Sequence, residues 1–153
     1  MTHAPGLIVL KPGQGRRIAA LGNLHLNKVE GADTDGAWAL VEQHVLGANP
    51  PLHLHEREDE AFYVLAGRVR VWVGDAEFEG DAGTFVLAPR GVPHTYARQP
   101  GEDLKLLVLV SPAGFEQMFD DVALLSETEQ NDPAALGEIA AHYGIQILGP
   151  PPQ

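Results

Sequence analysis

Residues 47–67 read GANPPLHLHEREDEAFYVLAG, and this stretch contains the pattern that decides the fold. His53 and His55 are separated by one leucine. Side chains on an extended strand alternate between its two faces, so both imidazoles point the same way, with Cα atoms roughly 6.6 Å apart. Two imidazoles at this spacing can bind one ion if the sheet curves around it.

Glu60 begins the next predicted strand, which continues through Leu65. Phe62 and Val64 share its face at a period of two, so the carboxylate would enter an apolar interior. A buried carboxylate costs free energy unless it is paired or bound to a metal. We therefore interpret Glu60 as a metal ligand. The other acidic residues of the preceding turn are expected to be solvated: Glu56, Glu58 and Asp59.

A second segment, residues 83–98, provides a third imidazole. The rigid corner Pro89–Pro93 leads into His94, and Tyr96 and Arg98 follow on the same face of the strand. Three imidazole nitrogens and one carboxylate oxygen suit a borderline first-row transition metal. We therefore expect one divalent ion per chain, and Mn, Fe, Co, Ni, Cu and Zn are all chemically admissible.

Both segments resemble the two motifs of the cupin superfamily, G-x5-H-x-H-x4-E-x6-G and G-x5-P-x-G-x2-H-x3-N. Nine of the ten motif positions match, and the last one, an Asn in the family, is Arg98 here. The matching positions are Gly47, His53, His55, Glu60, Gly67, Gly83, Pro89, Gly91 and His94. The resemblance implies an all-β, double-sheet jelly-roll barrel that holds the metal inside.

The chain of 153 residues is long enough for one domain with a single core, and we take residues 1–153 as a single cupin domain. Its 17 Gly and 12 Pro indicate many tight turns between short strands, which favours a barrel over about residues 16–111. After the barrel, apolar residues recur at the three- to four-residue spacing of a helix. A helical extension is therefore expected over residues 112–148, with helices at Pro112–Leu125 and Pro133–Tyr143. Their apolar stripes should dock on the barrel, and one of the helices is expected to cover its mouth.

Composition excludes several other classes of protein. A net charge of −11 argues against a nucleic-acid partner, because phosphate binding needs clustered Lys and Arg. Without Cys there are no thiolate ligands. No apolar run approaches the ~18 residues of a membrane span, and no secretory signal is visible. We expect a cytoplasmic homodimer that binds a small molecule.

Within the superfamily, the layout resembles single-domain proteins similar to flavonol (quercetin-type) dioxygenases. This resemblance rests on Asp33-Thr34, Pro50-Pro51-Leu52-His53, Pro112-Ala113-Gly114-Phe115, Tyr143-Gly144-Ile145 and Pro150-Pro151. It implies that dioxygen attacks a small phenolic or enolic compound held on the metal. Glu60 would then be both a metal ligand and the acceptor of the substrate's hydroxyl proton. The expected substrate pocket contains Phe62, Tyr96 and Arg98.

Two other function classes stay open. One is a metal-dependent isomerase, decarboxylase or hydrolase of a small oxygenated acid, whose carboxylate Arg98 could bind with two hydrogen bonds. The other is a non-catalytic small-molecule-binding module. Of the remaining histidines, His25 is expected to face solvent or to be hydrogen-bonded, and His44 is a candidate pocket residue.

Overall fold

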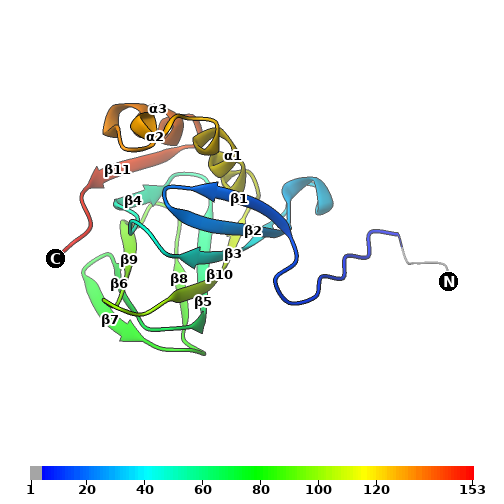
Figure 1. Ribbon diagram of the computed structural model, residues 1–153, viewed down its shortest axis with the longest axis horizontal. Helices are drawn as coiled ribbons and strands as arrows, with labels where there is room; N and C mark the ends of the chain where they lie inside the picture. Colours follow the sequence, from blue (N-terminus) through cyan, green and yellow to red (C-terminus); the bar gives the residue numbers. More distant parts are fainter. Residues whose placement is uncertain (1–4) are drawn as a thin grey trace.

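Two antiparallel β-sheets face each other in the computed structural model, which describes residues 5–153 (Figure 1). The first sheet has the order β1 (Arg16–Ala20), β2 (Asn23–Val29), β3 (Ala39–Val45), β10 (Leu104–Ser111), β5 (Asp59–Ala66) and β8 (Phe85–Ala88). The second has the order β11 (Ile145–Gly149), β4 (Leu52–His55), β9 (His94–Arg98), β6 (Val69–Val73) and β7 (Ala76–Gly80). The predicted all-β, double-sheet fold is therefore confirmed.

Strict alternation of side chains places the core between the sheets. In β10, the side chains of Leu104, Leu106, Val108 and Val110 are at most 2% exposed, whereas the residues between them are less buried. Val69 and Val71 of β6 are buried in the same way from the other sheet. Each sheet thus buries one face, as a half-exposed antiparallel sheet does.

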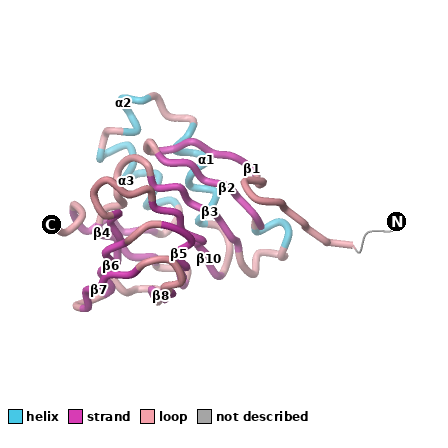
Figure 2. The backbone as a smooth tube through the Cα atoms, turned by 60° about the horizontal axis from the view of Figure 1, so that its bottom comes forward, coloured by secondary structure: helices cyan, strands magenta, loops and turns pink. Residues whose placement is uncertain are grey.

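The C-terminal segment forms short helices that cover one end of the barrel (Figures 1 and 2). They are η2 (Phe115–Gln117), α1 (Met118–Ala123), α2 (Glu127–Gln130) and α3 (Pro133–His142), in addition to η1 (Gly31–Asp33) between β2 and β3. Even α3 has only 10 residues. Within residues 5–153, no helix has the length and hydrophobicity that crossing a membrane requires.

The first of the two predicted helices is wrong at its start, whereas the second is confirmed. Ser111 does not cap a helix, because it ends β10 and its hydroxyl donates to the Ala37 carbonyl oxygen at 2.9 Å. Helical turns begin only at Phe115. At the second start, the Asp132 carboxylate accepts a hydrogen bond from the Ala134 backbone N–H at 3.0 Å. This is the N-cap arrangement that the Asp-Pro pair predicts.

The helices pack on the barrel as expected. Phe119 and Val122 of α1 and Ala140 of α3 are buried. The connection is fixed by Glu116, which is fully buried and accepts hydrogen bonds from the backbone N–H groups of Gly31 at 3.0 Å and Gly114 at 2.6 Å. One carboxylate therefore ties the helical segment to the β2–β3 connection.

After the last helix the chain returns to the barrel as β11. Gly144, at φ +70°, turns the backbone, and β11 then pairs antiparallel with β4, so that Ile147 lies opposite His53. The structure thus adds a strand to the barrel within the region 112–148 that we expected to be helical. The strand is only five residues long, too short for its period to be distinguished from the end of a helix.

His25 is buried between the barrel and α1, so the expectation of a solvent-facing or hydrogen-bonded ring is wrong. The residue is 3% exposed, and its ring stacks on Phe119 with centroids 3.8 Å apart. Neither ring nitrogen has a hydrogen-bond partner among residues 5–153. Burial lowers the pKa of His25 to about 4. The ring is therefore neutral near pH 7 and acts as part of the core.

This burial makes the stability of the fold depend on pH. The folded pKa of His25 lies below the unfolded value of about 6.5, so its stabilisation is fully present above pH ~6.5 and is lost as the pH falls toward 4. We expect His25→Phe, which keeps an aromatic ring against Phe119, to remove this component. Between pH 7.5 and 5.0, the free energy of unfolding should fall by about 2 kcal/mol more in the wild type than in the variant. Urea titrations in one metal state measure this difference, and equal losses would contradict the argument.

Candidate metal centre

The four predicted metal ligands, His53, His55, Glu60 and His94, meet between the two sheets. The histidines come from β4 and β9 of one sheet, and Glu60 comes from β5 of the other. One ligand atom from each residue lies within 4.8 Å of those of the other three. Ligands about 2.0–2.2 Å from a shared ion are separated by up to roughly 4.3 Å. The cluster therefore has nearly the size that one ion requires.

Backbone carbonyl groups set the tautomers of two of the rings. Nδ1 of His53 lies 2.7 Å from the Pro51 carbonyl oxygen, and Nδ1 of His94 lies 3.0 Å from that of Val92. Because a carbonyl group only accepts, Nδ1 carries the proton in both rings. Nε2 is then the ring nitrogen left to bind a metal ion in both histidines. Burial lowers the pKa of His53 to about 4, so this ring is neutral at pH 7.

Glu58 holds the third ring, and the expectation that it is solvated is wrong. It is 3% exposed, and its Oε2 lies 3.2 Å from Nδ1 of His55. A carboxylate at this position orients a ligand imidazole and makes it a stronger base. The turn after β4 folds Glu58 back onto the strand, and residues in a turn have no fixed period that would indicate this from sequence.

Glu60 provides negative charge at the centre of the cluster. Its Oε2 lies 2.8 Å from Nε2 of His94 and 3.0 Å from Nε2 of His55. Burial by itself raises the pKa of Glu60, but the charge of His55 and close contact with both rings hold it well below its usual range. Burial also lowers the pKa of His55, yet Glu60 and Glu58 together raise it to about 10. The carboxylates thus favour a positive charge at this point.

The buried atoms of the cluster fit a transition metal ion. Nε2 of His55 is fully enclosed, and its approach to Glu60 lacks hydrogen-bond geometry, so this nitrogen has no partner among residues 5–153. Buried polar atoms are rarely left without a partner. This ring nitrogen faces a carboxylate and two other ring nitrogens, which is the arrangement expected of a metal ligand. The three-nitrogen, one-oxygen set suits Mn, Fe, Co, Ni, Cu or Zn.

The cluster borders a cavity of about 110 Å³ between the barrel and the C-terminal helices. Its polar lining consists of Gln43, His53, Glu60 and Tyr96. The helical segment contributes apolar side chains, namely Phe115, Met118, Phe119, Val122, Leu136 and Ala140. Among the described residues that line the cavity, none is Lys or Arg. The space in front of the ligands is therefore mainly apolar, with a few polar groups in its lining.

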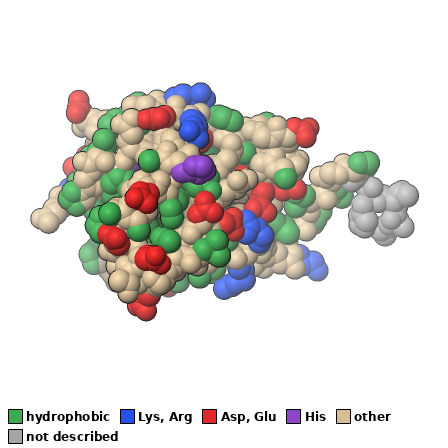
Figure 3. Space-filling view, turned by 90° about the horizontal axis from the view of Figure 1, so that it is seen from above, with side chains coloured by type: hydrophobic (Ala, Val, Ile, Leu, Met, Phe, Trp, Pro, Cys, Tyr) green, Lys and Arg blue, Asp and Glu red, His purple; other side chains and the backbone are tan. Residues whose placement is uncertain are grey.

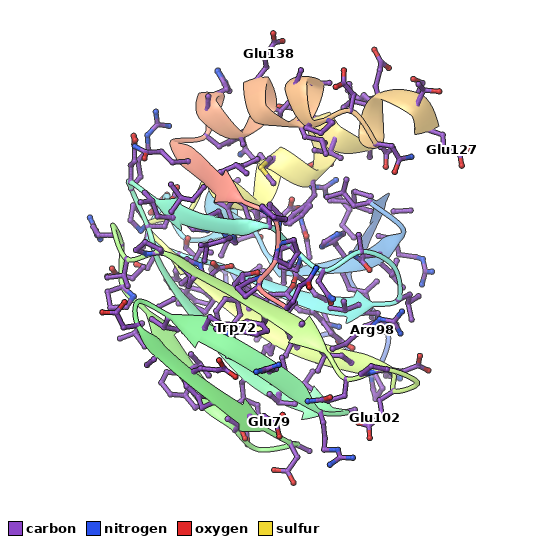
Figure 4. All side chains as sticks on the ribbon, turned by 90° about the vertical axis from the view of Figure 1, so that its left-hand side faces the viewer. Trp72, Glu79, Arg98, Glu102, Glu127 and Glu138 are labelled. Atoms are coloured by element: carbon purple, nitrogen blue, oxygen red, sulfur yellow. The ribbon has the colours of Figure 1, made fainter. Side chains whose placement is uncertain are left out.

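Of the three predicted pocket residues, only Tyr96 lines the cavity. Phe62 lies behind it, 3% exposed, with its ring centroid 5.4 Å from that of Tyr96. Arg98 lies near Glu102, to whose carbonyl oxygen its Nη1 donates at 3.4 Å (Figure 4). Burial, and then the charge of Glu60, raise the pKa of Tyr96, so its hydroxyl stays protonated.

Gln43 lines the cavity, and sequence reasoning missed it. It alternates with His44 on β3, whose buried face carries Ala39, Val41 and Val45 in addition to Gln43. His44, the alternative candidate, is on the other face with its Nε2 2.8 Å from the carboxylate of Glu42. Both faces of β3 mix polar and apolar residues, so the alternation alone did not decide which face is inside.

The outer surface of the helical cover carries acidic side chains. Figure 3, which looks onto this end, shows acidic side chains spread over it. Glu127 of α2 and Glu138 of α3 point away from the barrel (Figure 4). The helical segment therefore presents apolar side chains to the cavity and charged ones to solvent.

Comparison with known proteins supports the same fold. Residues 41–110 match the family model described as Cupin domain. Two solved structures share the fold at low sequence identity. The cupin domain of Schizosaccharomyces pombe Cnp3 is 15% identical, covering 67% of this chain and 70% of that one, with a TM-score of 0.54. Pac13 of Streptomyces, a nucleoside dehydratase, is 16% identical, covering 68% and 81%, with a TM-score of 0.54.

Among curated proteins, the chain is 27% identical over 100 residues to the probable oxidoreductase virH of Hypocrea virens. That match covers 58% of this chain and 46% of virH. An uncharacterized Streptomyces coelicolor protein, SCO3923, is 36% identical over 55 residues, covering 36% of this chain and 51% of that protein. The chain thus spans about half the length of the curated relatives that it matches.

Because Glu58 contacts His55 but is not itself a proposed ligand, its removal should lower the metal affinity while all four ligands remain. We expect Glu58→Ala to weaken Zn²⁺ binding roughly 10- to 100-fold, because the ring loses the carboxylate that orients it. The stoichiometry should stay at one ion. Glu56→Ala, an exposed position on the same turn, is the matched control and should bind like the wild type. Competition with a chromophoric chelator measures both affinities, and equal values would rule out a role for Glu58.

Proposed function

We propose that this chain, in which residues 41–110 form a cupin domain, is a metal-dependent dioxygenase of small phenolic or enolic compounds. One observation carries the proposal: the buried cluster of His53, His55, Glu60 and His94 borders an apolar cavity. Four protein ligands leave up to two positions on a six-coordinate ion. The cavity offers a substrate direct access to that side of the cluster.

The chain's own residues supply the other requirements of the reaction. When bound, the ion would supply Lewis-acid and redox chemistry to a substrate oxygen. Glu60 lines the cavity, so its carboxylate can accept the proton of a substrate hydroxyl. The apolar wall of Phe115 and Phe119 excludes water from the reacting groups. Both atoms of dioxygen would enter the product, so the reaction needs no external reductant.

The oxidoreductase class has further support from virH, which is named as a probable oxidoreductase. The class that acts on small oxygenated acids has less support. Its case depended on Arg98, which is not among the lining residues of the cavity. With no Lys or Arg among the described lining residues, the proposed ion would be the cavity's one positive partner for a substrate carboxylate.

Metal analysis combined with an oxygen-uptake screen tests the proposal. After reconstitution with each candidate metal, we expect about one equivalent per chain. A triple variant, His53→Ala, His55→Ala and His94→Ala, should bind none. Oxygen uptake is then screened over one-ring phenols and β-dicarbonyl compounds. Turnover that persists without oxygen would indicate Lewis-acid chemistry instead, and tight binding without any turnover would indicate a binding module.

The proton-accepting role of Glu60 makes a separate prediction. Glu60→Gln should lower turnover roughly 10²- to 10⁴-fold even in fully metallated protein, because an amide cannot accept a proton at neutral pH. The comparison is made at matched metal content, since loss of a ligand also abolishes turnover. Glu56→Gln, at an exposed position, serves as the control. Near-native turnover of metallated Glu60→Gln would remove the proton-accepting role.

A further inference from the structure

Gln43 brings an uncommitted hydrogen-bond donor to the cavity wall. Its side chain lines the cavity, and the residue is only 5% exposed. The Tyr96 hydroxyl donates to its Oε1 at 2.6 Å. None of residues 5–153 forms a hydrogen bond with the Gln43 amide nitrogen. Both ring nitrogens of His25, which lies opposite Gln43 on the neighbouring strand β2, are also without a hydrogen-bond partner among these residues. Tyr96 therefore fixes the carbonyl end of Gln43 and leaves two N–H donors free.

The size of the cavity limits which ligands can accept a hydrogen bond from the Gln43 amide. Its volume of about 110 Å³ is of the order of a buried cavity of roughly 150 Å³ that holds one benzene ring. A three-ring flavonol exceeds this space, so part of it would extend beyond the cavity. The flat side chains of Phe115 and Phe119 suit a single ring.

The charge of the lining limits the ligand further. Glu60 is the charged group that the cavity presents, and no Lys or Arg among the described lining residues opposes a second anion. A divalent ion would be balanced by Glu60 and by one deprotonated ligand oxygen, so a carboxylate elsewhere on the ligand would be buried without a partner, which is costly. A neutral molecule avoids this cost. It can still bring a hydroxyl group to Glu60 and an acceptor oxygen to Gln43.

On the premise of the proposed metal site, we infer that the substrate is a neutral, one-ring phenol or enol with a second, hydrogen-bond-accepting oxygen, and that Gln43 selects it. The hydroxyl lies toward Glu60 and the acceptor oxygen toward the Gln43 amide. A buried site built to hydrogen-bond one group of a ligand rejects analogues that lack it, because its own donor is then left unpaired. Gln43 is thus a specificity-determining residue, and Tyr96 is its positioning residue.

Calorimetry on the Zn²⁺-loaded protein tests the ligand class, because zinc has no redox chemistry and binding is then measured without turnover. The probe is 3-hydroxy-4-pyranone, a neutral one-ring hydroxyketone. Two comparison ligands carry the same hydroxyketone unit: 3-hydroxyflavone has three rings, and 5-hydroxy-4-pyranone-2-carboxylate is anionic. We expect the pyranone to bind at least about 10-fold more tightly than either. If the flavone binds as tightly as the pyranone or more tightly, the proposed limit on ligand size is wrong. If the carboxylate does so, the proposed limit on ligand charge is wrong.

Substitutions test the role of Gln43. Gln43→Met, of similar size but without a donor, should weaken pyranone binding roughly 10- to 100-fold. Tyr96→Phe, which frees the Gln43 carbonyl, should cause a smaller loss. Gln117→Met, at an exposed position, is the matched control. If Gln43→Met loses its zinc, Gln43→Leu is measured in its place.

The outcomes separate this inference from the proposed function. Wild-type affinity of a zinc-loaded Gln43 variant for the pyranone would overturn the selecting role of Gln43 while the metal site stands. Failure of the wild-type protein to retain zinc would instead overturn the proposed function, and the inference with it.

Discussion

A carboxylate buried between two sheets, that of Glu60, is the constraint on which the rest of the structure depends. The residue is 4% exposed, and it lies on β5 with Val110 and Ala88 as its neighbours on the flanking strands. A charge at such a position is tolerated only where opposite charge or hydrogen bonds compensate its lost hydration. The opposite sheet supplies three imidazoles for this purpose. Electrostatics at this point thus join the two sheets in addition to the apolar core between them.

The surroundings of the cluster hold its rings in place. Glu58 and two backbone carbonyl groups hold the rings by Nδ1, so that their Nε2 atoms face Glu60. The helices and β11 border the space in front, and the buried carboxylate of Glu116 fastens the start of the helical segment to the β2–β3 connection. Because electrostatic interactions strengthen as water is excluded, the cover contributes to the properties of the metal centre as well as to stability.

Sequence reasoning succeeded where a fixed period or a fixed spacing carries the information. The alternation around His53 and His55 placed both rings on one face, and the spacing of the second motif identified His94. It failed where contacts arise between distant segments. His25 is buried only because α1 packs over it, and Glu58 returns to His55 only through the shape of a turn. Local sequence patterns indicate neither the burial of His25 nor the contact of Glu58 with His55.

On the proposed function, a neutral substrate solves an electrostatic problem that the cavity creates. An additional anionic group on the substrate would lose its hydration against an apolar wall that offers it no Lys or Arg among the described lining residues. A neutral phenol or enol enters without that cost. Transfer of its hydroxyl proton to Glu60 then creates the reactive anion inside the cavity while the total charge of the cavity stays constant. The apolar helical cover and the buried carboxylate therefore act together. The cover disfavours the entry of an anionic substrate, and Glu60 allows the substrate anion to form inside the cavity.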